Sequence, residues 1–230
     1  MLTSQNHQKP LALVVFLENI GHIHGVRLPQ WVMDLIDFST EEYAKLLLRL
    51  YGAYRHYDKI IILEDQRATG PELAAALLSA SQTHRVDILL LVHGNRGCLI
   101  GYKGKDLVGA ETFQPLIDAY HQDASLLNLR MVYGINCYGS TLTETWLALG
   151  AQAVNGALGI NWLPEPSLSV FLYNWLKGKK YSQAVQRSNQ QANQIWRKIL
   201  KPDQAGEDHP WLQSSRQMVF GVRDITIDSN

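Results

Sequence analysis

The chain has 230 residues, of which 46% are hydrophobic and 18% are charged. This is the composition of a globular protein in the size range of one domain, with enough apolar residues to bury a core. The 21 basic and 21 acidic side chains cancel, so the charge balance gives no reason to expect nucleic acid or a membrane surface as a partner. The two cysteines, Cys98 and Cys137, are too few for a disulfide framework, and we expect both to be free thiols.

The first predicted element is the apolar run at residues 11–17. It is only seven residues long and continues directly into Glu18, without the cleavage pattern of a signal peptide. No later apolar run approaches the roughly 18 to 20 residues that span a bilayer. We therefore predict a buried strand here, and a cytoplasmic protein in which a thiol stays reduced.

The loop that follows this strand, residues 18–27, carries Glu18, His22 and His24. If the sheet has the usual 2-1-3-4-5 strand order, this loop adjoins the edge where the third strand ends. The three side chains are therefore candidate substrate contacts, and Glu18 could also orient an imidazole. An ordinary surface loop is the alternative. A His-x-His pair can suggest a metal, but no third ligand stands at a recognisable spacing, so no metal is predicted.

Four more apolar runs rich in Val, Ile and Leu follow along the chain, at residues 59–63, 86–92, 129–135 and 151–158. Segments with helical spacing alternate with the runs, and patterns typical of helix N-caps stand at Ser39, Thr69 and Thr141. Strands that are apolar throughout, alternating with capped helices, predict an α/β fold. We expect a three-layer sandwich with a mostly parallel central sheet.

Two parts of the chain depart from this alternation. Residues 98–107 predict a small hairpin with Lys103-Gly104-Lys105 in the turn region. After residue 158 the pattern changes to two helices, at about 167–176 and 182–200, followed by a polar loop and a closing strand within 216–227.

Reactive residue types stand at the ends of two predicted strands. The run at 86–92 stops at His93-Gly94, and the run at 129–135 is followed by Cys137 and Gly139. Consecutive parallel strands are usually neighbours, and their carboxyl ends meet at one edge of the sheet. We therefore expect His93 and Cys137 to face one cleft.

A thiol beside an imidazole is the pair needed for nucleophilic catalysis. His93 would take the thiol proton, and the Cys137 sulfur would attack a carbonyl carbon. The backbone amides of Gly94 and Cys137 are the natural donors to the oxyanion. The alternative stays open that Cys137 is a buried apolar cysteine and His93 a histidine that happens to end a strand.

An α/β-hydrolase is disfavoured, because that fold needs a glycine two residues before the nucleophile and a catalytic histidine after it. Here Ile135 occupies the first position, and His93 precedes Cys137 by 44 residues.

The order of strand, His93-Gly94, hairpin, helix, strand and Cys137-x-Gly139 resembles the caspase-like (clan CD) cysteine peptidases, in which the spacing is similar. The region 149–185 is similar to the bacterial CHAT branch of that clan. In that branch a helix, a strand, a Trp-containing turn, a helix, and a glycine followed by an Ala-Val helix occur in this order. The resemblance covers roughly residues 59–200. It implies one caspase-like domain over residues 1–230, with 201–230 as a C-terminal extension packing on it.

The resemblance implies a cysteine endopeptidase that acts through an acyl-enzyme on a peptide or protein substrate and needs no cofactor. His93 would be the base and Cys137 the nucleophile. Asn161 and Trp162, in the Trp-containing turn, become further candidate substrate contacts.

Two residues beside the nucleophile depart from the pattern of the active relatives, and both are also candidate substrate contacts. Asn136 stands where these proteins usually carry alanine. Ile135 stands where Arg- or Lys-specific relatives often carry an acid, so cleavage after Arg or Lys is not expected.

Two other functions remain open. One is a catalytically silent caspase-like domain that binds a regulatory protein partner, consistent with Asn136 and with residues 177–201, which hold seven Lys or Arg and no acid. The other is a non-peptidase α/β domain that binds a small ligand at the same sheet edge.

Overall fold

The computed structural model describes residues 9–18, 42–162, 164–202 and 205–229. Within them the strands form one eight-stranded sheet of order β2-β1-β3-β6-β7-β8, with β4 and β5 added at the end of β3. Pairing is parallel from β2 to β7, and β8 is antiparallel to β7. Counted among the five parallel strands alone, this is the 2-1-3-4-5 order that the sequence analysis assumed as a condition. The strands are β1 (Leu11–Glu18), β2 (Lys59–Leu63), β3 (Arg85–Asn95), β4 (Cys98–Ile100), β5 (Leu107–Gly109), β6 (Leu129–Gly134), β7 (Ala153–Ala157) and β8 (Gln217–Gly221).

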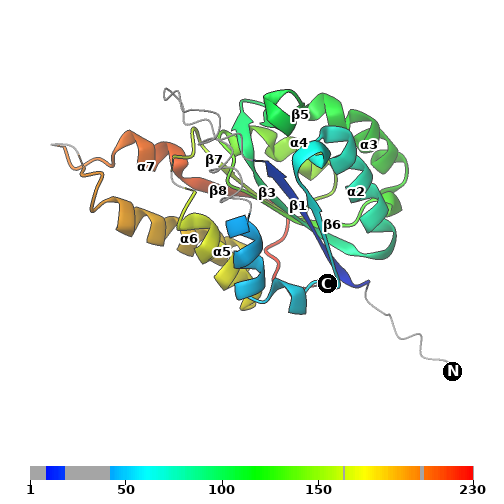
Figure 1. Ribbon diagram of the computed structural model, residues 1–230, viewed down its shortest axis with the longest axis horizontal. Coiled ribbons are helices and arrows are strands. Elements are labelled where there is room, and N and C mark those ends of the chain that lie inside the picture. Colours follow the sequence, from blue (N-terminus) through cyan, green and yellow to red (C-terminus); the bar gives the residue numbers. More distant parts are fainter. Residues whose placement is uncertain (1–8, 19–41, 163, 203–204, 230) are drawn as a thin grey trace.

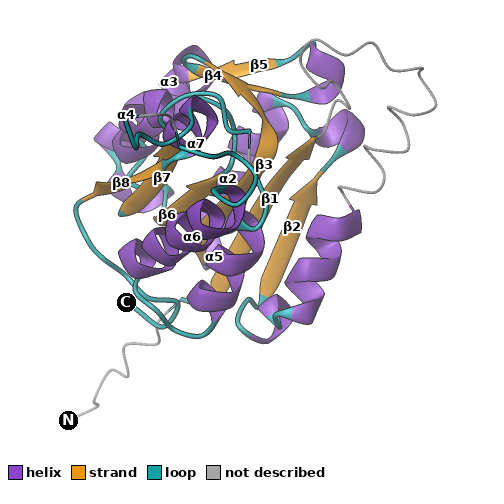
Figure 2. Ribbon diagram, turned by 90° about the vertical axis from the view of Figure 1, so that its left-hand side faces the viewer, coloured by secondary structure: helices purple, strands orange, loops and turns teal. Residues whose placement is uncertain are grey.

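Helices cover both faces of this sheet, which makes the predicted three-layer sandwich (Figure 1). Figure 2 shows the parallel strands running side by side between the two helical layers. The α-helices are 42–50, α2 (Gly70–Thr83), α3 (Ala110–Gln122), α4 (Thr143–Ala148), α5 (Ser167–Leu176), α6 (Tyr181–Trp196) and α7 (Pro210–Ser215). Short 3-10 helices are η1 (Ala53–Arg55), η2 (Asp65–Arg67), η3 (Tyr102–Gly104), η4 (Ala124–Leu126) and η5 (Gly139–Leu142).

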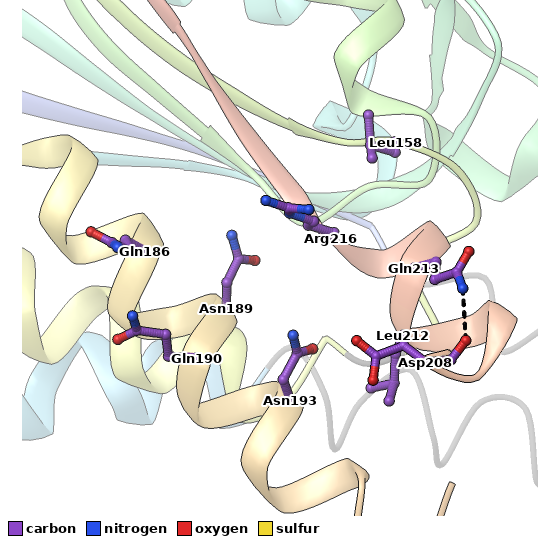
Figure 3. Close-up of a pocket in the computed structure, with 9 residues that line it drawn as sticks. All are labelled: Leu158, Gln186, Asn189, Gln190, Asn193, Asp208, Leu212, Gln213 and Arg216. Carbon is purple, nitrogen blue, oxygen red and sulfur yellow. Dashed lines mark hydrogen bonds between the residues drawn. The ribbon is translucent and has the colours of Figure 1, made fainter. Parts of the chain in front are cut away.

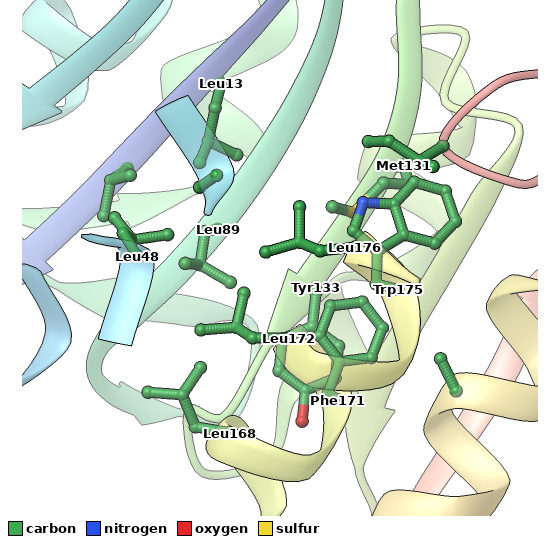
Figure 4. Close-up of a cluster of buried hydrophobic side chains, with 14 of the residues drawn as sticks. Leu13, Leu48, Leu89, Met131, Tyr133, Leu168, Phe171, Leu172, Trp175 and Leu176 are labelled. Carbon is green, nitrogen blue, oxygen red and sulfur yellow. The ribbon is translucent and has the colours of Figure 1, made fainter. Parts of the chain in front are cut away.

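Alternation along the strands divides the core into two clusters. On β1, for example, Leu13 and Val15 belong to one cluster, and Val14 and Phe16 to the other. The first cluster packs under helix 42–50, α5 and α6 (Figure 4), and the second packs under α2, α3 and α4. Strands buried on both faces explain why their sequences are apolar throughout.

The C-terminal segment is built into this core. Strand β8 adds an edge strand to the sheet beside β7, and Ile225 and Ile227 are buried in the first cluster. Arg130 lies near the amino end of β6, at the edge of the sheet opposite to His93 and Cys137. Its guanidinium donates to the carbonyls of Thr226 and Ile227. It also forms a buried ion pair with Asp87, in which Nε and Oδ1 are 3.5 Å apart. The C-terminal residues are therefore held by the burial of two isoleucines and by hydrogen bonds from a charged guanidinium.

The helix predictions hold in part. Helix α5 has the predicted bounds, and Thr69 caps α2 by accepting a hydrogen bond from the Glu72 amide. Ser39 lies outside the described residues. Thr141 is no cap: α4 begins at Thr143, because η5 intervenes.

Several element ends differ from the predictions. The α6 helix ends at Trp196, whereas the helical spacing of the sequence predicted an end at about residue 200. The closing strand is limited to β8, because the following residues 222–229 leave the sheet. In the described residues, no helix is both long and apolar enough to cross a bilayer.

Candidate active site

The carboxyl edge of the sheet brings the two predicted motifs together. Strands β3 and β6 are neighbours, and the last pair in their register is Leu90 with Gly134. His93 and Cys137 each lie three residues beyond that pair. Neither strand ends where the apolar run suggested. β3 continues through His93 to Asn95, because these residues pair with β4, whereas β6 ends before Ile135.

The backbone of Gly94 packs directly against the loop that carries Cys137. A Cβ atom at Gly94 would lie less than 3.0 Å from the Cys137 carbonyl oxygen and 3.0 Å from the Asn136 side-chain nitrogen. Glycine is therefore required by close approach of two chain segments, and its φ is not in the left-handed region. The His93-Gly94 segment and the Cys137 loop meet at this contact.

The thiol of Cys137 is half-buried and hydrogen-bonded. The main-chain amide of Asn161 donates to its sulfur over 3.3 Å. Burial raises the pKa of the thiol above its ordinary value, while the amides of Asn161 and of Cys137 itself lower it. Because burial is the largest of these effects, the resting thiol is neutral and needs a base to become a nucleophile.

Asn136 lies beneath the site and is only 2% exposed. Its side chain fills the space left by three glycines, since Cβ atoms at Gly94, Gly134 and Gly139 would each approach it closely. The side-chain amide donates to the Cys137 carbonyl over 3.4 Å. The side chain of Asn136 is thus accommodated by the packing around it. Because it is buried, the prediction that Asn136 contacts the substrate is corrected, and Asn136 is a buried residue that supports the loop of Cys137.

Ile135 and Asn161 are hydrogen-bonded to each other beside Cys137. The Ile135 side chain is partly buried and packs on the first core cluster, and its amide donates to the Leu90 carbonyl. The Asn161 side-chain nitrogen donates to the Ile135 carbonyl over 2.6 Å. Of the predicted contacts, Asn161 is thus brought to the Cys137 sulfur.

Trp162 stacks on a residue far away in the sequence. Its ring lies 4.7 Å from the ring of Trp211 in α7, with 18° between the planes, and its amide donates to the Ser215 hydroxyl. Trp211 is 42% exposed. This indole pair forms an aromatic surface next to Asn161, and the role of Trp162 as a substrate contact stays a prediction.

Glu18 ends β1 and pairs in register with Val92, one residue before His93. Its carboxylate accepts a hydrogen bond from the Lys103 amide over 2.9 Å, which ties β1 to the predicted hairpin formed by β4 and β5. His22 and His24 lie outside the described residues. Among the residues that the structure describes, no three His, Cys, Asp or Glu side chains gather closely enough to hold a metal ion.

The loop after β3 and the loop after β6 are joined to each other by contacts that the sequence did not indicate. The Gly97 amide donates to the Thr141 hydroxyl, which in turn donates to the Tyr138 carbonyl. The Arg96 guanidinium lies 5.0 Å from the centre of the Tyr138 ring. Tyr138 has a left-handed φ of 53°, so the turn directly after Cys137 depends on such support.

Asn155 is a buried supporting residue that the sequence analysis did not identify. From within β7, its buried side chain accepts a hydrogen bond from the Gly134 amide and donates to the Gly134 carbonyl, as a paired strand would. It also bonds to Tyr181 and Gln217. An asparagine inside an otherwise apolar strand was the available signal, because a buried amide needs partners.

A hollow of about 510 Å³ lies between α6 and α7 and contains neither member of the candidate pair (Figure 3). Five carboxamide side chains dominate its lining, together with Asp208 and Arg216. Leu158, one residue before Gly159, and Leu212 and Gln213 of α7 are among its lining residues.

No protein-family model and no curated protein sequence matches the chain. Its structure is similar to the crystal structure of the Arg-specific cysteine proteinase gingipain R, with a TM-score of 0.60 and 12% identity over 96% of this chain and 48% of that chain. It is also similar to the complex of the Porphyromonas gingivalis RgpB pro- and mature domains, with a TM-score of 0.57 and 13% identity over 94% of this chain and 49% of that chain. The chain thus spans about half the length of these proteins. At such low identity the likeness concerns architecture, and the chain has the caspase-like α/β fold of these clan CD cysteine proteinases.

Proposed function

We propose that the chain is a cysteine endopeptidase of the caspase-like type, with Cys137 as nucleophile and His93 as base. The observation that carries this proposal is the close approach of Gly94 to the Cys137 carbonyl, which joins the two strand-end motifs at one point. The fold it shares with cysteine proteinases supports the same reaction class.

The reaction begins from a neutral thiol, because burial raises the pKa of Cys137. The His93 imidazole takes the thiol proton while the sulfur bonds to the peptide carbonyl carbon. The negative oxygen is stabilised by the amides of Gly94 and Cys137. Collapse of this intermediate breaks the C–N bond, and His93 gives its proton to the departing amine. Water, deprotonated by His93, then hydrolyses the thioester and restores the thiol.

The substrate is a peptide or protein, and the reaction needs no cofactor. Within clan CD, residues 149–185 favour the CHAT branch. The Arg specificity named for gingipain R is not carried over, because Ile135 places an aliphatic, partly buried side chain two residues before the nucleophile. The free thiols of Cys98 and Cys137 favour a reducing compartment, the cytoplasm.

The test is a peptide-library digest with the wild-type chain, Cys137→Ala and His93→Ala. We expect cleavage by the wild type and a loss of at least about 10³-fold in both variants, as for removal of a nucleophile or its base. Cleavage that persists in Cys137→Ala would overturn the proposal.

Labelling with iodoacetamide decides the remaining case, a wild type without cleavage. If His93→Ala then leaves the alkylation rate of Cys137 unchanged, the enzyme assignment is rejected. The silent domain that binds a protein partner would take its place.

A further inference from the structure

Residues 159–162 are bonded to the nucleophile loop along one side. The Gly159 carbonyl accepts a hydrogen bond from the Tyr138 amide over 2.7 Å. The Asn161 amide donates to the Cys137 sulfur over 3.3 Å, and its side chain donates to the Ile135 carbonyl over 2.6 Å. Residues on both sides of the nucleophile, and the nucleophile itself, are thus held by one short segment.

The same segment is bonded to α7 along its other side. The Ser214 hydroxyl donates to the Ile160 carbonyl over 2.9 Å, and the Trp162 amide donates to the Ser215 hydroxyl over 2.9 Å. The stack of Trp162 on Trp211 adds an aromatic contact. Because α7 follows the nucleophile by more than 70 residues in the sequence, this arrangement exists only in the folded chain.

We propose that Asn161 is a positioning residue for the nucleophile, and that the contacts of α7 with Ile160 and Trp162 hold Asn161 in place. Its side-chain bond to Ile135 fixes the direction of its own main-chain N–H, which points at the Cys137 sulfur. A donor at this place stabilises the thiolate more than the thiol, and so opposes the effect of burial. The inference deepens the proposed function and rests on it for its catalytic meaning.

The experiment measures the rate of iodoacetamide alkylation of Cys137 against pH, peptide by peptide, so that Cys98 serves as an internal reference. In Asn161→Ala we expect the midpoint of the Cys137 profile to move up by about 0.5 to 1 pH unit, which makes alkylation at pH 7.5 about three- to tenfold slower. Cys98 should react as in the wild type. Asn161→Gln, which keeps a donor, should lie between the two.

Two further variants separate positioning from general damage. Trp211→Ala touches neither Cys137 nor Asn161 directly, and it should move the midpoint in the same direction by a smaller amount. Asn193→Ala, in α6, is the matched control and should change nothing. With a cleaved peptide, Asn161→Ala should lower kcat and leave KM unchanged, as expected for a residue that acts through the nucleophile.

An unchanged Cys137 midpoint in folded Asn161→Ala would overturn the inference. If that variant does not fold, unchanged midpoints in both Asn161→Gln and Trp211→Ala would overturn it. Alkylation needs no peptide substrate, so a shifted midpoint in a chain without peptidase activity would reject the proposed function and keep Asn161 as a positioning residue for a reactive thiol.

Discussion

Replacing Gly94 by alanine tests the contact on which the candidate site depends. The added methyl group would lie less than 3.0 Å from the Cys137 carbonyl oxygen. Non-bonded heavy atoms are most favourably placed about 3.5 to 4.0 Å apart, so one of the two segments must move by at least about 0.5 Å. The neighbouring Asn136 side chain, 3.0 Å from the same position, leaves little room on that side.

The expected cost has two parts. Overpacking a well-filled site costs about 1 to 3 kcal/mol of unfolding free energy. Because a displacement of about 1 Å can cost about 100-fold in rate, a shift of half that size or more should slow catalysis by about 10- to 100-fold. Both effects come from steric overlap, since Gly94 does not need a left-handed φ.

Urea unfolding measures the loss of stability, and the rate of peptide cleavage at fixed pH measures the loss of catalysis. Gly52→Ala is the control for backbone strain without overpacking: Gly52 has φ of 79° and only an ordinary contact at its Cβ position, 3.7 Å from the Arg55 side chain, so it should lose about 1 kcal/mol with little change in peptide cleavage. If Gly94→Ala keeps wild-type stability and the wild-type rate of peptide cleavage, the two strand-end motifs are not in the close contact described here, and the reasoning fails.

Three other substitutions or titrations have defined outcomes. Arg130→Met leaves the buried Asp87 without its ion-pair partner and should cost about 3 to 5 kcal/mol in denaturant unfolding; the double variant with Asp87→Asn should recover part of this loss, and a single variant as stable as the wild type would contradict the pairing. Asn155→Leu removes four buried hydrogen bonds and should cost about 2 to 4 kcal/mol; calorimetry measures this, and a neutral result would mean that the amide is dispensable. Because burial raises the Cys137 pKa, alkylation of Cys137 should keep rising with pH beyond 9.0, the ordinary value for a thiol; a plateau at lower pH would instead indicate a preformed ion pair with His93.

The sequence by itself predicted the layers, because burial on both faces of a parallel strand leaves a direct mark on composition. The mostly parallel sheet, the hairpin after His93 and the bounds of α5 were confirmed by the structure. The two strand-end motifs were also predicted to lie on neighbouring strands, and their strands are neighbours. These features depend on local pattern and on general rules of chain connection.

The surroundings of Cys137 were decided only by the tertiary structure. Asn136 is unusual in sequence, yet glycines distant along the chain make a space that it fills. Trp162 meets Trp211 because α7 folds back over the segment that holds Cys137. Periodicity reports that a residue is buried, but not which distant residue covers it, and a hydrogen bond between residues far apart in the chain leaves no mark on the sequence around either of them. For this protein the sequence therefore predicted which two residues form the candidate pair, whereas the residues that support them could be identified only from the fold.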